Sequence, residues 1–194
     1  MKICWGFCGS FCTAARAISA LETLKNTGHD LLPVFSFSFQ NIDTRFGKAS
    51  DICAKIEEIC GKPAVRTLAG AEPVGPVEKP DLMIVAPLTG NSLSKLSHGV
   101  SDTPVTLAAK AHLRNGRPLL LALASNDALG GNFENLARLY ARKNIYFVPL
   151  LQDDPARKPN SLVAQFERIP AAAKAAVEGR QLLPLFVAAN SGNE

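Results

Sequence analysis

Short polar segments that combine glycine with hydroxyl side chains follow several apolar runs of this sequence. In the first of them, residues 6–11, Gly9 allows a backbone to come close, Ser10 supplies a hydroxyl, and a predicted helix begins directly afterwards. The free N–H groups at the start of a helix favour an anion. An ordinary capped turn has the same composition, so for this segment alone both interpretations stand.

The most specific of these segments, residues 87–92, follows the most strongly apolar run of the chain. Its Thr89 and Ser92 hydroxyls and its Asn91 amide can face a ligand. The same three side chain types are good helix caps, and the two roles are compatible.

Two further polar segments lie later in the chain. Asn126 and Asp127 stand shortly before two adjacent glycines and can recognise the polar edge of a ring. Residues 152–161 include Arg157 and Lys158, which can clamp a carboxylate. Solvated surface charge is the alternative for this basic pair. Together the four segments predict a site for a small phosphate-bearing or multiply anionic ligand.

The elements that must position these segments alternate between short apolar runs and longer amphipathic ones, which is the pattern of repeated βα units. We therefore predict a doubly wound, Rossmann-like α/β fold with a mostly parallel six-stranded sheet in three α/β/α layers. The predicted strands cover residues 2–7, 31–37, 63–68, 81–86, 118–124 and 145–150, and the third of them is expected at an edge. In such sheets ligands bind beyond the carboxyl ends of the strands, where the polar segments fall.

We expect one domain over residues 1–187, in which residues 152–187 form a loop and a helical arm, and a flexible tail over residues 188–194. The helical arm is expected to be interrupted at Pro170. His112 is expected at the surface.

The composition excludes several classes of protein. The 194 residues are 47% hydrophobic and 20% charged, with a net charge of +4, so the chain can bury a core. Basic residues form no run and do not alternate with aromatic ones, which argues against a nucleic-acid partner. No segment approaches the roughly 18 apolar residues of a membrane span. With no cleavage-like site after the N-terminus, we expect a cytoplasmic protein.

Five cysteines in a chain without a secretory signal indicate reduced thiols. Cys4, Cys8 and Cys12 recur every four residues, but four residues of a strand span about 13 Å, too far for one shared ion. We therefore expect no metal site and interpret most cysteines as small buried hydrophobic residues.

The segments after the first two strands do not fit a dinucleotide site. The first lacks the third glycine of the G-x-G-x-x-G fingerprint, and the second strand ends in the hydroxyls of Ser36 and Ser38 with no acid at its tip. A dinucleotide site requires a carboxylate there for the ribose. Hydroxyls at this place suit a terminal phosphate.

Residues 87–92, Pro-Leu-Thr-Gly-Asn-Ser, resemble the PASANT motif of the flavin-containing cysteine decarboxylase superfamily. In that family the motif contacts flavin mononucleotide (FMN) and the substrate carboxylate. Asn126 matches the asparagine of a second family motif, and the turn at Gly9 and Ser10 matches contacts with the flavin phosphate. Decarboxylation itself is argued against, because no histidine lies within residues 30–97 and because the methionine and tryptophan of the second motif are absent.

Residues 43–47, 86–92, 143–147 and 152–155 resemble the family of dipicolinate synthase B subunits, and this likeness runs from Lys2 to about residue 185. It implies a role beside a nicotinamide-dependent A subunit in the NAD(P)-linked oxidation of dihydrodipicolinate to dipicolinate during sporulation. It also implies FMN as a cofactor, a homo-oligomer, and a place in the cytoplasm of the mother cell.

The resemblance and the loop positions together predict the site residues. Cofactor contacts are expected from Gly9, Ser10, Phe11, Ser36, Ser38, Thr89, Gly90, Asn91, Ser92, Ser125 and Asn126. Contacts with a small dicarboxylate substrate are expected from Arg45, Asn91, Arg157 and Lys158, and Asp127 is expected to accept the proton. Two alternatives remain open: an FMN-dependent enzyme that acts alone, and a non-catalytic binding subunit that shapes the partner's site.

Overall fold

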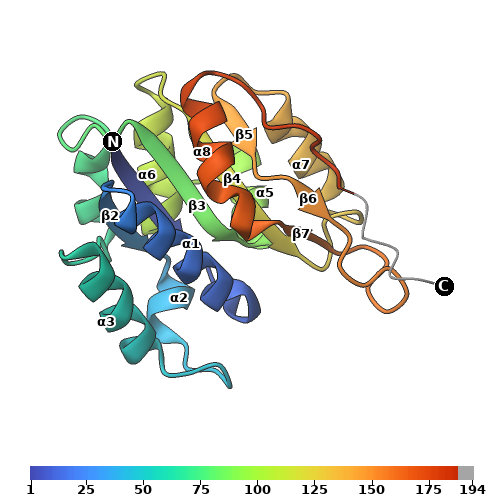
Figure 1. The fold of residues 1–194 in the computed structure, drawn as a ribbon, viewed down its shortest axis with the longest axis horizontal. Coiled ribbons are helices and arrows are strands. Elements are labelled where there is room, and N and C mark those ends of the chain that lie inside the picture. The colour runs from blue at the N-terminus through green and yellow to red at the C-terminus, as the bar shows by residue number, and fades with distance from the viewer. Residues whose placement is uncertain (188–194) are drawn as a thin grey trace.

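The computed structural model describes residues 1–187 and places five parallel strands at the centre of the molecule (Figure 1). In chain order these are β1 (Lys2–Phe7), β2 (Asp30–Phe35), β3 (Leu82–Leu88), β4 (Leu119–Ser125) and β5 (Ile145–Phe147). Their order across the sheet is β2-β1-β3-β4-β5, and every neighbouring pair is parallel. The predicted doubly wound α/β fold is therefore confirmed.

The free edge of β4 is shared by two strands. β5 pairs with its first half, while β7 (Leu162–Ala164) pairs antiparallel with Ala124 and Ser125 at its carboxyl end. The short β6 (Leu150–Leu151) extends this antiparallel part from β7. Within residues 1–187 the sheet thus has seven strands where the sequence predicts six, and β7 brings the end of the 152–161 segment beside the carboxyl end of β4.

Helices cover both faces of the sheet. In Figure 1, α1 (Ala14–Asn26) and α8 (Ile169–Val177) lie in front of it, while α5 (Gly90–His98), α6 (Pro104–Leu113) and α7 (Phe133–Tyr140) lie behind. The remaining helices are α2 (Phe37–Asn41), α3 (Ala49–Cys60) and α4 (Leu68–Ala71), with 3-10 turns at Phe11–Thr13, Glu72–Val74 and Phe166–Arg168.

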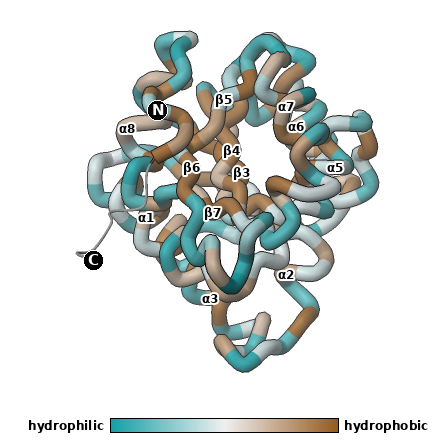
Figure 2. The backbone as a smooth tube through the Cα atoms, turned by 90° about the vertical axis from the view of Figure 1, so that its right-hand side faces the viewer, coloured by the Kyte–Doolittle hydropathy of each residue, from teal (hydrophilic) through white to brown (hydrophobic). Residues whose placement is uncertain are grey.

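Burial explains why the central strands are apolar throughout. Every residue of β3 is buried, as expected for a parallel strand covered by helices on both faces. The apolar strands form the middle of the molecule in Figure 2, and the buried apolar side chains join in one continuous cluster. None of the helices within residues 1–187 has the length and apolar composition of a membrane span.

Local chemistry sets where the helices behind the sheet begin and end. The Thr89 hydroxyl caps α5 by accepting from the Ser92 backbone N–H, and α5 ends at Gly99, whose φ is 74°. Thr103 and Thr106 form a reciprocal capping box at the start of α6. These caps fix the loop after β3 and the direction in which the chain returns to β4.

Three predictions about the elements are wrong. Residues 63–68 form no strand, because Pro63 has no N–H to donate and Thr67 already caps α4, so that a single bridge from Val65 to Val34 remains. Residues 145–150 divide into β5 and β6, since Pro149 interrupts the ladder. Pro170 does not interrupt the last helix but lies in its first turn, where proline is tolerated.

The predicted surface position of His112 is also wrong. Its side chain is fully buried, and Nε2 lies 2.8 Å from the backbone oxygen of Pro118. The predicted tail, residues 188–194, lies outside the described residues.

Candidate functional site

Backbone hydrogen bonds join the loops that follow β1, β2 and β3. Cys8 N–H donates to the Pro87 oxygen at 3.1 Å, and Ser36 N–H donates to the Phe7 oxygen at 3.0 Å. Because β1 lies between β2 and β3, these bonds gather three strand-end loops at the point where the strand order reverses. Open parallel sheets bind ligands at this point.

The turn after β1 lies against the end of β2. A Cβ at Gly9 would lie only 2.8 Å from Ser38 Oγ, so a side chain here would displace the Ser38 side chain. Ser38 Oγ in turn lies 3.2 Å from Ser36 Oγ. Ser36 is nearly buried and caps α2 by accepting from the Phe39 backbone N–H, whereas Ser38 is exposed. The structure therefore brings the predicted Gly9, Ser36 and Ser38 together.

The loop after β3 shows how helix capping and site chemistry share residues. Thr89 Oγ1 accepts from Ser92 N–H at 3.2 Å and donates to Ser92 Oγ at 3.1 Å. Ser92 is buried and also contacts the thiol of Cys8, whereas the neighbouring Asn91 is exposed at the start of α5. Thus Asn91 is the side chain of this loop that faces outward.

A cavity of about 310 Å³ opens between the turn after β1, the loop after β4 and the 152–161 segment. Its polar lining consists of Ser10, Thr13, Arg16, Ser125, Asn126, Asp153 and Lys158, and Cys12, Ala124 and Val163 also line it. Of the predicted site residues, the structure gathers Ser10, Ser125, Asn126 and Lys158 around this cavity. Its size is within the usual range for small-ligand sites.

Two cations line this cavity, and their ion pairs differ. Arg16 Nη2 lies 3.2 Å from Glu167 Oε2, and its guanidinium also stacks over the Phe166 ring at 5.1 Å. Lys158 Nζ lies 3.6 Å from Asp153 Oδ2, a longer contact. Lys158 is therefore the cation that an incoming anion can reach with the smallest rearrangement.

Asp127 organises its own loop. Its Oδ1 accepts from Gly131 N–H at 3.1 Å, and its Oδ2 accepts from Asn132 Nδ2 at 3.2 Å. Its backbone N–H lies 3.3 Å from Ser125 Oγ. The carboxylate thus holds the segment that presents Ser125 and Asn126 to the cavity.

Other predicted residues lie apart from this cavity. Arg45 stacks over the ring of Phe46 at 4.9 Å in the exposed turn between α2 and α3. Arg157 is exposed and is not part of the cavity lining, although it is adjacent to Lys158.

Sequence reasoning missed Cys12, Thr13, Arg16 and Asp153 as lining residues. Thr13 and Arg16 follow Ser10 in the first helical turns after β1. Their spacing from Ser10 could therefore have predicted that they lie beside it. Of the thiols, Cys12 is exposed, whereas burial raises the pKa of Cys4 to about 12 and that of Cys8 to about 11. The buried thiols therefore stay protonated at neutral pH.

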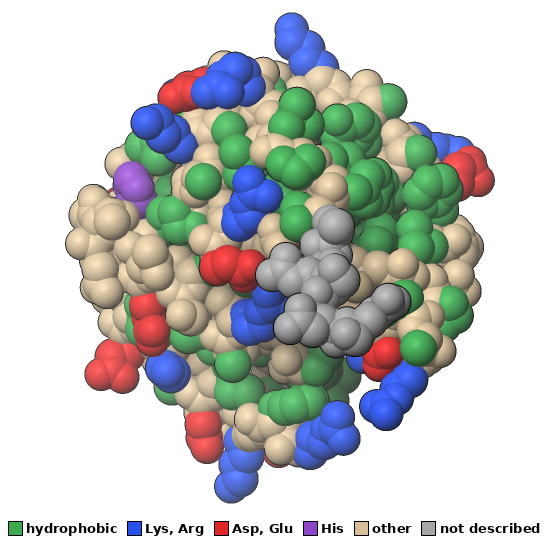
Figure 3. Space-filling model, turned by 45° about the vertical axis from the view of Figure 1, so that its right-hand side comes forward, with side chains coloured by type: hydrophobic (Ala, Val, Ile, Leu, Met, Phe, Trp, Pro, Cys, Tyr) green, Lys and Arg blue, Asp and Glu red, His purple; other side chains and the backbone are tan. Residues whose placement is uncertain are grey.

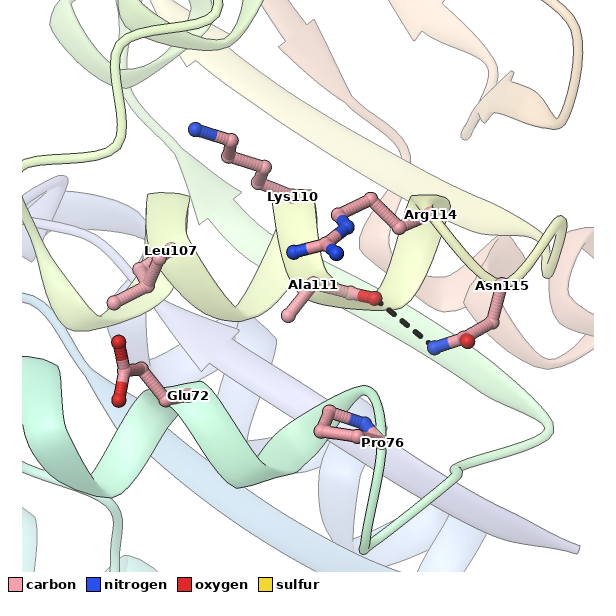
Figure 4. A pocket seen from close by; sticks show the side chains of 7 residues that line it. All are labelled: Glu72, Pro76, Leu107, Lys110, Ala111, Arg114 and Asn115. Carbon is pink, nitrogen blue, oxygen red and sulfur yellow. Dashed lines mark hydrogen bonds between the residues drawn. The ribbon is translucent and has the colours of Figure 1, made fainter.

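A cavity of about 560 Å³ lies elsewhere, between α6 and the connector (residues 69–80) that precedes β3 (Figure 4). Figure 4 shows Glu72 directed toward Leu107 and the Asn115 amide donating to the Ala111 oxygen at 3.1 Å. Its lining comes from these two segments and not from the loops at the strand ends. On the face seen in Figure 3, basic and acidic side chains are interspersed, without a continuous basic stripe.

The chain shows clear similarity to known proteins. The model of the Flavoprotein family matches residues 1–166. The dipicolinate synthase B subunit of Bacillus subtilis (strain 168) is 44% identical over 193 residues, which cover 100% of this chain and 96% of that protein.

Solved structures agree with this similarity. The crystal structure of the dipicolinate synthase B subunit from Bacillus halodurans has a TM-score of 0.88 at 42% identity, covering 96% of this chain and 95% of that chain. The FMN-dependent cysteine decarboxylase SpaF has a TM-score of 0.66 at 19% identity, covering 92% of this chain and 97% of that chain. This second likeness shows a shared fold.

Proposed function

Because this chain belongs to the flavoprotein family and, within it, to the family of dipicolinate synthase B subunits, we propose that it is one subunit of a dipicolinate synthase. In this proposal it works with an A subunit that binds NAD(P), in the mother cell of a sporulating bacterium. The strand-end cavity receives the dicarboxylate substrate. The observation that carries the proposal is the convergence of Ser10, Asn126 and Lys158 on that cavity.

The residues around the strand ends fit FMN. The lack of a side chain at Gly9 and Gly90 lets the strand-end loops approach each other, since a Cβ would lie 2.8 Å from Ser38 Oγ and 2.7 Å from Ser125 Oγ. Hydroxyl donors at Ser10, Ser36 and Ser38 suit a phosphate, as does the nearby start of a helix. Phe11, Thr89, Asn91, Ser92 and Asn126 are the remaining proposed contacts. When bound, FMN supplies a two-electron acceptor.

The dicarboxylate is held by charge and by amides. We assign one carboxylate to Lys158, whose ammonium already lies in the cavity lining, and place the Asn126 amide beside it. Asn91, exposed at the start of α5, is the proposed second contact. Arg45 and Arg157 are proposed as outer contacts that reach the ligand only by loop movement.

Oxidation of dihydrodipicolinate removes a hydride and a proton from the ring and leaves an aromatic pyridine. A nicotinamide held by the A subunit would supply the two-electron acceptor for the hydride, and a base on this chain would take the proton. Asp127 is the proposed base, because an ionised carboxylate keeps further lone pairs beyond the two hydrogen bonds that its oxygens accept here.

The experiment that tests this proposal assays the two subunits separately and mixed, by formation of NAD(P)H from NAD(P)⁺ and dihydrodipicolinate. Activity only on mixing supports the two-subunit enzyme. Activity of this chain alone with FMN identifies instead an independent flavoenzyme. Full activity of the A subunit alone, with unchanged rate on mixing, contradicts the proposal. Light scattering of the purified chain checks the proposed homo-oligomer.

A further inference from the structure

Gly90 lies where the loop after β3 contacts the loop after β4, and two side chains of the second loop lie close to its Cα. A Cβ at this buried position would lie 2.7 Å from Ser125 Oγ and 2.8 Å from Asn132 Nδ2. Gly90 has no positive φ, so its backbone conformation is open to any residue. A Cβ at Gly90 would therefore displace the side-chain ends of Ser125 and Asn132 from their present positions.

The Asn132 amide is bonded at both ends. Its Nδ2 donates to Asp127 Oδ2 at 3.2 Å, and its Oδ1 accepts from Asn135 Nδ2 at 3.1 Å. Asn135 is nearly buried on α7, and its Oδ1 accepts from Ser97 Oγ at 2.6 Å. The chain of bonds thus runs from the loop after β4, through α7, to the last turn of α5.

Ordinary helix capping does not account for Asn132. It stands at the N-cap position of α7, where asparagine is common, yet its side chain makes no capping hydrogen bond. Instead its amide bonds Asp127 within the same loop and Asn135 in the first turn of α7. Within this network Asn135 is nearly buried, Asn132 is half-buried and Asp127 is exposed, and the hydrogen bonds link the loop after β4 to α7 and α5.

We propose that Asn132 is a positioning residue of the strand-end site. The absence of a side chain at Gly90 allows the Asn132 amide to take up its observed position. Asn132 holds the Asp127 carboxylate, and Asp127 holds the segment that presents Ser125 and Asn126 to the cavity. The inference rests on the proposed function in one respect: it takes the Ser125–Asn126 edge to contact the bound ligand.

The test is a double-mutant cycle on the full-length chain, with FMN as the probe. The dissociation constant is measured by quenching of FMN fluorescence for the wild type, Gly90→Ala, Asn132→Ala and the double variant. Each single variant is expected to bind FMN about fivefold more weakly, and the double variant no more weakly than Asn132→Ala, since neighbouring sites couple. Asn115→Ala, which removes an exposed amide at the end of α6, is expected to change the constant less than about twofold.

Two outcomes overturn the inference: effects of Gly90→Ala and Asn132→Ala that multiply in the double variant, or no effect of Gly90→Ala. Absence of FMN binding by the wild type contradicts the proposed flavin site instead. In that event the inference is tested by the backbone amide NMR signals of Ser125 and Asn126. If Asn132 positions these two residues, both single variants shift these signals. Unchanged signals in both variants overturn the inference.

Discussion

Replacement of Lys158 tests whether the strand-end cavity binds a dicarboxylate by charge. Lys158 Nζ lies in the lining of this cavity and 3.6 Å from Asp153 Oδ2. In Lys158→Ala the cavity loses the cation with the longer ion pair, while Asp153 keeps its negative charge. We therefore expect weaker binding of dipicolinate, the product of the proposed reaction.

The magnitude follows from the exposure of the pair. Hydrogen bonds to charged groups contribute about 1.5–3 kcal/mol when well shielded. The Lys158 side chain is 47% exposed and that of Asp153 is 33% exposed, so solvent screens the contact and about 1 kcal/mol remains. This corresponds to about a fivefold increase in the dissociation constant. Asp153→Asn removes the competing charge, and the dissociation constant is expected to decrease by a similar factor.

Isothermal titration calorimetry with dipicolinate measures these constants. Lys174→Ala is the matched control, because Lys174 is an exposed lysine on α8 outside the cavity, and it is expected to change the constant less than about twofold. Higher salt should reduce the effect of Lys158→Ala. If Lys158→Ala behaves as the control while Arg157→Ala shows the fivefold loss, the assignment of the cation is refuted.

Three other perturbations have defined outcomes. Gly9→Ala places a Cβ against Ser38 and is expected to weaken FMN binding about tenfold in a fluorescence titration, while the midpoint of urea unfolding stays unchanged. If the variant binds FMN as tightly as the wild type, the assignment of the phosphate to this turn is contradicted. Cys12 is exposed in the cavity wall, so alkylation by iodoacetamide, followed by mass spectrometry, should be slowed by bound FMN; an unchanged rate under saturating FMN counts against this location. Burial lowers the pKa of His112 in the folded chain. At acidic pH the unfolded chain therefore binds a proton at this residue that the folded chain does not. As a result, the free energy of unfolding decreases as the pH drops below about 6.5. His112→Gln should flatten this fall in urea titrations, whereas a slope as steep as that of the wild type contradicts the assignment to His112.

The parts of the fold that the sequence predicts well are those with strong local signals. The run that forms β3 is apolar at every position, and Thr89 and Gly99 mark the two ends of the next helix. The antiparallel β7 escaped prediction because it has only three residues, all buried, without the alternation that marks a half-exposed strand. Its pairing depends on the free edge that β5 leaves on β4, which is a tertiary property.

The candidate site was predictable as a set of loops but not as a cavity. Carboxyl ends of parallel strands meet at one edge, so Ser10 and Asn126 could be placed together from the sequence. Nothing in the sequence separates Lys158 from its neighbour Arg157, since both are basic residues of one irregular segment. The distinction comes from the path of that segment into β7, which turns one side chain toward the cavity. The role of Asn132 was invisible because it depends on contact with Gly90 across two loops.

A crystal structure of this chain with FMN tests most directly whether the strand-end loops form the ligand site. We expect the phosphate within hydrogen-bond distance of the hydroxyls of Ser10, Ser36 or Ser38, with the ring directed toward the loops after β3 and β4. FMN bound in the cavity between α6 and the connector, or at any place away from these strand ends, would contradict this expectation.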